Sequence, residues 1–173
     1  MLEQLRIGYD PEEDRLVLQI RTDDPASAEG HTLALTRRVW LQARQNLGAM
    51  IEASAEPPAR LATPQRQAVA AIHHQALAAT VPMRSEPPKD KLAGMPHELV
   101  LSMRCGRRRS DRRWVLGFGL RGKPDLSLVL NDRTMHALVN ALFKRESSLQ
   151  WGLPPIKALD QAGAPGPRPT ELH

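Results

Sequence analysis

The strongest constraint on the fold is a pattern of alternating apolar residues that ends in a helix cap and occurs twice along the chain. In the first copy, apolar side chains alternate over residues 5–9, 16–20 and 33–35. Such alternation is typical of strands that bury one face. Thr36 then precedes an apolar stripe at helical spacing over 39–51, and threonine is a favoured helix cap. The first copy therefore predicts three strands followed by a helix.

The second copy restates the first. Apolar residues alternate over 99–103, 114–120 and 126–130, and Asn131 stands in the cap position before a helical stripe over 135–143. A direct overlay brings strand, cap and helix stripe into register, pairing Leu33 with Leu128, Leu35 with Leu130, Thr36 with Asn131, Arg38 with Arg133 and Leu47 with Leu142. This register predicts an internal repeat that rests on pattern rather than on identical residues.

The segments outside the two copies complete the expected layout. Thr63 and Pro64 predict the start of an alanine-rich helix, as a cap followed by proline at the first helical position. We predict an α+β fold of two β-β-β-α units, with antiparallel strands and one packing helix each, joined by a helical arm. The expected layout is one globular domain over 1–151, with a first unit (1–56), an arm and Pro-rich linker (57–97) and a second unit (98–151), followed by a flexible Pro/Gly-rich tail (152–173). One continuous sheet and two small sheets both remain open.

Composition excludes several classes of protein. A chain of 173 residues, 41% of them hydrophobic, can bury a core without a metal or a disulfide. The single cysteine, Cys105, excludes an internal disulfide and any metal cage built from cysteines. No apolar stretch approaches the ~20 residues that span a bilayer, and the acid-rich start does not resemble a signal peptide. We therefore expect a bacterial cytoplasmic protein with no membrane partner.

The positive charge lies in one segment. The formal net charge is +5, and residues 104–113 hold six arginines and one acid, Asp111, so the rest of the chain is formally neutral. Forked guanidinium groups favour carboxylate or phosphate partners. We predict an arginine hairpin that binds an acidic group through Arg104, Arg107, Arg108, Arg109, Arg112, Arg113 and Trp114. The alternative is a solvated tip that only keeps strand ends from pairing with other chains. The contact would also disappear if these arginines were satisfied by the protein's own carboxylates.

The chain carries few signs of chemistry. Neighbouring arginines would lower the pKa of the Cys105 thiol, but a nucleophile also needs a base, and no motif links Cys105 to His97 or His136. The strand alternation instead predicts Cys105 as a small core residue. His73 and His74 diverge by about 100° on a helix, so we interpret them as surface or partly buried polar residues rather than metal ligands. No metal site, cofactor loop or catalytic triad is predicted, and an enzyme is the least favoured class.

Several segments carry a resemblance: Tyr9-Asp10-Pro11-Glu12-Glu13-Asp14-Arg15-Leu16, Leu33 to Arg38, the helical 67–76, and 126–151. In these segments the chain resembles a set of small, functionally uncharacterised proteobacterial proteins, which implies a bacterial cytoplasmic setting. The architecture of strands followed by one packing helix, twice over, is also similar to PUR-repeat and Whirly-type single-strand nucleic-acid binders. Those units carry four strands before the helix, whereas three are expected here.

Two binding functions from different classes follow. The first is a non-enzymatic adaptor or assembly protein that binds an acidic protein partner through the arginine hairpin, with Trp114 as an anchor. Two copies could also pair edge to edge as a homodimer. The second is a single-stranded nucleic-acid-binding protein, whose arginines contact phosphates while Trp114 or Phe118 stacks on bases. An enzyme with an unrecognised site is the third.

Overall fold

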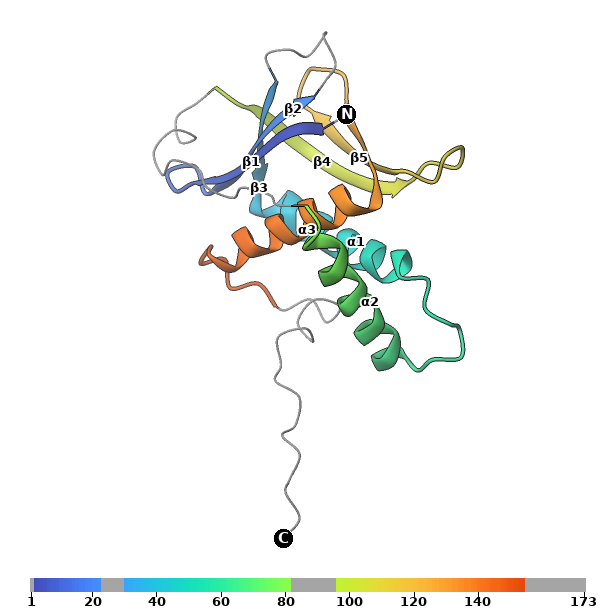
Figure 1. Ribbon diagram of the computed structural model, residues 1–173. Coiled ribbons are helices and arrows are strands. Elements are labelled where there is room, and N and C mark those ends of the chain that lie inside the picture. The colour runs from blue at the N-terminus through green and yellow to red at the C-terminus, as the bar shows by residue number, and fades with distance from the viewer. Residues whose placement is uncertain (1, 23–29, 82–95, 155–173) are drawn as a thin grey trace.

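The computed structural model describes residues 2–22, 30–81 and 96–154, so most of the expected linker over 85–96 and the tail from 155 lie outside the described residues (Figure 1). The fold is α+β, and the order strand-strand-strand-helix occurs twice, with one further helix between the two units. In chain order the elements are β1 (Leu2–Asp10), β2 (Arg15–Thr22), β3 (His31–Thr36), α1 (Arg37–Ser54), α2 (Thr63–Ala78), β4 (Glu98–Arg107), β5 (Trp114–Leu120), β6 (Leu126–Leu130) and α3 (Asp132–Ser147).

All six strands belong to a single sheet in the order β1-β2-β3-β4-β5-β6. Neighbouring strands are antiparallel within each unit, as predicted, but β3 and β4 are parallel where the units meet. The prediction of antiparallel strands concerned each unit and is confirmed there, whereas the direction of pairing at the junction was left open. A parallel pair needs a long crossover, and α1 and α2 provide it by carrying the chain back to the end of the sheet where β3 began.

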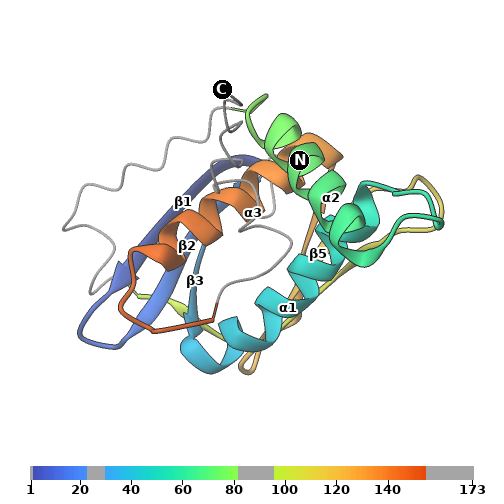
Figure 2. The same cartoon turned by 90° about the horizontal axis from the view of Figure 1, so that it is seen from below.

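The three helices lie on one side of the sheet, and the core fills the space between (Figures 1 and 2). Helix α1 packs against β3 and β4, while α2 rests on α1 and α3. The sheet curls so far that its edge strands β1 and β6 come into contact, and α3 lies against β1. Both units supply the largest fully buried side chains: Leu16, Leu18, Ile20, Leu33, Leu35, Trp40, Leu47, Ile51, Leu116, Phe118, Leu130 and Met135.

The helix starts follow local signals. The predicted caps are confirmed, because Thr36 Oγ1 accepts from the Val39 backbone N–H at 3.3 Å and Asn131 Oδ1 accepts from that of Thr134 at 2.8 Å. Helix α2 starts one residue earlier than predicted, with Thr63 inside the helix and Ala62 as its cap. The helix of each unit, α1 and α3, therefore begins with the same cap geometry.

Strand β4 departs from the predicted alternation. Its pairing with β5 shifts between Val100 and Ser102, which marks a β-bulge. The extra residue turns Leu101 outward, 50% exposed, while Val100 and Met103 are buried against the helices. The prediction that Leu101 shares a face with Met103 is therefore wrong. After the bulge the alternation resumes, so that Cys105 packs against the core as predicted.

Candidate functional site

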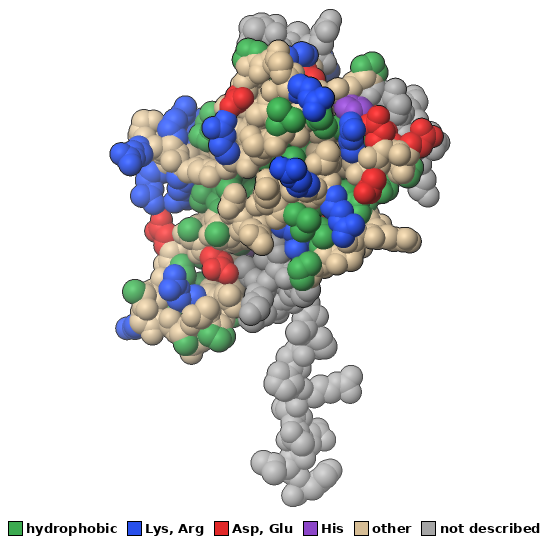
Figure 3. Space-filling model, turned by 180° about the vertical axis from the view of Figure 1, so that it is seen from behind, with side chains coloured by type: hydrophobic (Ala, Val, Ile, Leu, Met, Phe, Trp, Pro, Cys, Tyr) green, Lys and Arg blue, Asp and Glu red, His purple; other side chains and the backbone are tan. Residues whose placement is uncertain are grey.

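The arginine hairpin, residues 104–114, joins β4 to β5. Its tip is closed by two backbone bonds, from the Arg108 N–H to the Arg113 carbonyl at 2.8 Å and from the Arg112 N–H to the Arg108 carbonyl at 2.9 Å. Arg112 lies in the left-handed region, with φ +57°. Such a conformation costs a residue other than glycine about 1 kcal/mol or more and is concentrated at functional loops. Figure 3 shows the tip as a group of basic side chains that projects beyond the body.

A clamp of three residues fixes the base of the hairpin to α3. The guanidinium of Arg107 lies over the Trp114 ring, 4.4 Å from its centroid, and Arg107 Nη2 donates to Asp132 Oδ1 at 2.9 Å. Trp114 Nε1 donates to the same oxygen at 2.6 Å. Burial acts to raise the pKa of Asp132, but these two hydrogen bonds outweigh it, and the pKa lies below its ordinary value. The clamp therefore holds a charged carboxylate and a fixed hairpin base.

Most of the remaining arginines also have carboxylate partners. Arg108 bonds Asp111, and this hydrogen bond is the main reason why the pKa of Asp111 is lowered to about 2. The other pairs are Arg104 with Asp125, Arg107 and Arg112 with Glu56, and Arg113 with Asp111. Within the described residues, Arg109 alone of the six forms no ion pair. Six arginines and four carboxylates leave a net charge of +2.

The pairs at the tip are weak because they are exposed. The side chains of Arg112 and Arg113 are 71% and 57% exposed, and Glu56, the partner of Arg112, is 66% exposed. Surface pairs of this kind contribute about 0–1 kcal/mol, so a carboxylate of a partner can replace them at little cost. We call Arg109, Arg112 and Arg113 the tip arginines. The three others are engaged at the base of the tip or on the sheet.

The aromatic residues of the predicted site are not available to a partner. Trp114 is 4% exposed and Phe118 is 1% exposed, because their strand face is the one that the helices cover. The prediction that Trp114 anchors an interface is therefore wrong, as is the prediction that Trp114 or Phe118 stacks on bases. No aromatic side chain in the described ranges is exposed; Tyr9 itself packs edge-on against Trp151 at 6.2 Å.

The thiol of Cys105 is poorly suited to nucleophilic attack. Its side chain is partly buried against the core, and this burial raises the pKa of the thiol. The neighbouring arginines point elsewhere, since Arg104 bonds Asp125 and Arg107 bonds Asp132. A raised pKa leaves less thiolate, the reactive form, at neutral pH.

The sequence analysis missed one polar cluster, where α2 meets α3. His74 is buried rather than on the surface, and its Nδ1 lies 2.8 Å from Nδ1 of His136, which is also buried. His136 Nε2 lies 3.1 Å from Ser54 Oγ at the end of α1. The two histidines are 62 residues apart, so no spacing motif could reveal them. Burial is the main reason why the pKa of each is lowered to about 4.

The described residues contain neither a candidate metal cluster nor a candidate membrane-spanning helix. No three His, Cys, Asp or Glu side chains among them are grouped so that they could hold a metal ion. No helix in this part of the chain has both the length and the apolar character needed to cross a membrane. Comparisons with protein-family models, with curated proteins and with solved structures found no match for this chain.

Proposed function

We propose that the protein is a non-enzymatic adaptor that binds an acidic segment of a protein partner through the tip arginines. The observation that carries the proposal is the contrast between the two ends of the arginine hairpin. Its base is locked by the clamp of Arg107, Trp114 and Asp132. Arg112 and Arg113 are instead held in solvent with weak partners, and Arg109 has no ion-pair partner among the described residues. Rigid support with exchangeable pairs is the arrangement that a recognition surface needs.

Binding would proceed by exchange of carboxylates. A glutamate or aspartate of the partner takes the place of Glu56 at Arg112 and of Asp111 at Arg113, and a further carboxylate contacts Arg109. Forked contacts of a guanidinium with a carboxylate give both geometry and strength. Because the groups are exposed, the interaction weakens as salt is added, and much of its effect is on the rate of association.

The test compares two triple charge reversals. Arg109→Glu/Arg112→Glu/Arg113→Glu removes the tip, and Arg38→Glu/Arg60→Glu/Arg66→Glu is the matched control, because these three arginines are exposed and form no ion pair with a described residue. Wild type and both variants are used to capture proteins from nuclease-treated lysate of cells that carry the gene. Urea unfolding checks that the variants remain folded.

We expect a protein that is captured by wild type and by the control, is lost with the tip variant, and binds through an acidic segment when purified. Equal capture by all three forms refutes the proposal. A parallel capture is made from lysate without nuclease. A partner that is captured only there also refutes the proposal, and would favour phosphate contacts made by the same arginines.

A further inference from the structure

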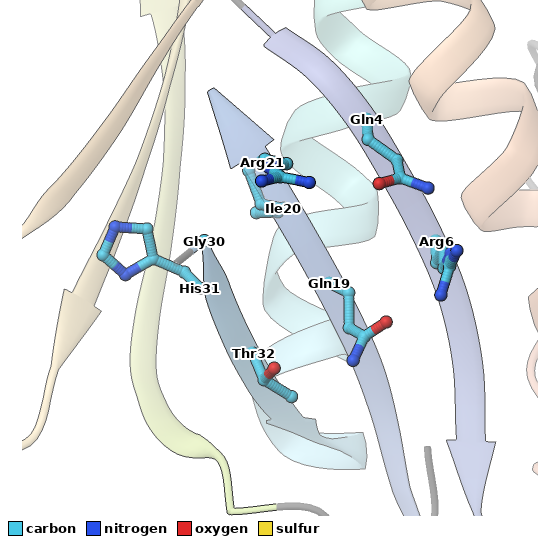
Figure 4. Close-up of a pocket in the computed structure, with 8 residues that line it drawn as sticks. All are labelled: Gln4, Arg6, Gln19, Ile20, Arg21, Gly30, His31 and Thr32. Atoms are coloured by element: carbon cyan, nitrogen blue, oxygen red, sulfur yellow. The ribbon is translucent and has the colours of Figure 1, made fainter. Parts of the chain in front are cut away.

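A second basic surface lies on the face of the sheet that points away from the helices. There, β1, β2 and the start of β3 border a hollow of about 410 Å³ (Figure 4). It is lined by Gln4, Arg6, Gln19, Ile20, Arg21, Gly30, His31 and Thr32. None of these residues belongs to the arginine hairpin, so an inference drawn from the hollow is independent of the proposed function.

The strand register explains why polar groups gather here. Arg6 lies opposite Gln19, and Gln19 lies opposite Thr32, so these three form one row across the three strands. Gln4 and Arg21 form the next row. Side chains directly opposite each other in antiparallel strands are close neighbours on one face, and the intervening residues face the core. Two guanidinium groups therefore share a floor of amide and hydroxyl groups.

The backbone at the rim of the hollow requires glycine. Gly30 has φ +75°, and a Cβ at this position would lie 2.8 Å from the carbonyl oxygen of Ile20. A larger residue would push β3 away from β2 at the point where the two strands border the hollow. The chain therefore enters β3 with no side chain that could fill the space.

The charges of the described residues that line the hollow are unbalanced. None of these residues is an aspartate or a glutamate. In contrast to most arginines of the hairpin, Arg6 and Arg21 form no ion pair with any described residue. His31 reaches toward β4, where its Nδ1 lies 3.6 Å from Glu98 Oε1. Two neighbouring guanidinium groups repel each other, and an anion between them removes that repulsion.

The lining also limits the kind of anion. Planar, forked donors on a polar floor suit the oxygens of a phosphate group. Among the described lining residues there is no Phe, Tyr or Trp ring on which a base could stack, and the ring of His31 reaches toward β4; the volume is that of a small-molecule site. We propose that this hollow binds the phosphate group of a small phosphorylated molecule, with Arg6 and Arg21 as the charged contacts and Gln4, Gln19 and Thr32 as the polar floor.

The experiment titrates sodium pyrophosphate into the full chain and follows the backbone amide signals by NMR. Arg6→Gln/Arg21→Gln removes both charges of the hollow. Arg60→Gln/Arg66→Gln removes two exposed arginines elsewhere and is the matched control. A parallel titration with an oligothymidylate of about ten nucleotides separates a phosphodiester source from a small molecule, because the oligomer offers phosphates without a terminal dianion.

We expect pyrophosphate to shift the amide signals of β1, β2 and early β3, to bind more tightly than the oligomer, and to bind roughly tenfold more weakly to Arg6→Gln/Arg21→Gln than to the control. The proposal is overturned if the shifts are spread over the whole molecule, if both double variants lose binding equally, or if the oligomer is the tighter ligand. The tip arginines are intact in both variants, so failure here leaves the proposed function untouched.

Discussion

The hydrogen bonds around His74 and His136 predict that the protein loses stability in mild acid. Ser54 Oγ donates to the Ile51 carbonyl at 2.7 Å, so this oxygen can accept a proton from His136 Nε2. His136 Nδ1 is then an acceptor, and it receives the Nδ1 proton of His74 at 2.8 Å. This chain of bonds needs His136 to be neutral, because a second proton on His136 would place two N–H groups face to face.

The surroundings of the pair also disfavour its protonation. Burial is the main reason why the pKa of both falls from 6.5 to about 4; repulsion by His73 adds to the shift of His74, and repulsion by His74 adds to that of His136. His73 packs edge-on against His136 at 5.3 Å and acts in the same direction, as does Arg107. Asp132 opposes the shift but is the weaker influence.

The sign of the pH dependence follows from linkage. The unfolded chain takes up protons near pH 6.5, whereas the folded pair resists them until about pH 4, so acid favours unfolding over this interval. The stabilising contribution is complete above pH 6.5 and is lost as the pH falls to about 4. A shift of this size on one histidine corresponds to about 3 kcal/mol. Because the two titrate as a coupled pair, their contributions do not add in full, and we expect about 3 kcal/mol for the pair.

Urea unfolding at about pH 7.5 and about pH 4.5 measures this loss. Carboxyl groups begin to take up protons at the lower pH, so their contribution must be subtracted with a variant that keeps every carboxyl group. His74→Gln/His136→Gln is the comparison, because glutamine keeps polar groups in place but does not titrate. Only the change between the two pH values is compared, so a lower baseline in the variant does not matter. The prediction is refuted if the wild-type protein is equally stable at both pH values or if the variant loses as much stability as the wild type. It is also refuted if the imidazole NMR signals of His74 and His136 titrate near pH 6.5.

Two further predictions concern the internal repeat. Leu47 and Leu142 occupy matching positions in α1 and α3 and are 1% and 0% exposed, so replacing either with alanine should cost about 2–5 kcal/mol in urea unfolding; a loss under about 1 kcal/mol at both would show that neither helix face packs in the core. Asp14→Gly should cost about 1–3 kcal/mol, because the buried Trp151 N–H loses its acceptor. Arg112→Gly should leave the free energy of unfolding unchanged or raise it by up to about 1 kcal/mol. A loss of more than about 1 kcal/mol would show that the Arg112 side chain stabilises the fold.

The elements of each unit were predictable because their signals are local. Alternation over 16–20 and the caps at Thr36 and Asn131 depend on neighbours a few residues away. The parallel junction of β3 and β4 depends instead on the path of two helices between them, which no short pattern describes. The bulge at Leu101 was missed because every residue from Leu99 to Leu101 is apolar, so the pattern could not show where the register shifts.

The site shows the same division. The run of arginines was visible in the sequence, but their partners Glu56, Asp125 and Asp132 lie far along the chain and carry no signal of pairing. Trp114 looked like an interface residue because it adjoins the arginines. Trp114 and Leu116 are two residues apart on one strand and therefore share the face that is buried in the core. The strand pattern predicts the burial of Trp114 better than the charge of the adjacent arginines does.

The turns of the two hairpins share a residue with positive φ, but the side chain of that residue has a different role in each turn. Asp14 at the β1–β2 turn and Arg112 at the β4–β5 turn both precede the returning strand with φ near +50° to +60°. The exposed carboxylate of Asp14 accepts from Tyr9 Oη and from Trp151 Nε1, each at 2.6 Å, so its strained conformation is offset by contacts of the fold. Arg112 has the same strain, but its one ion pair is solvent-exposed on both sides and offsets little of it. Since glycine would fit the turn of Arg112 better, the arginine at this position supports the proposed contact with a partner, and the two glycine variants compare the two turns within a single chain.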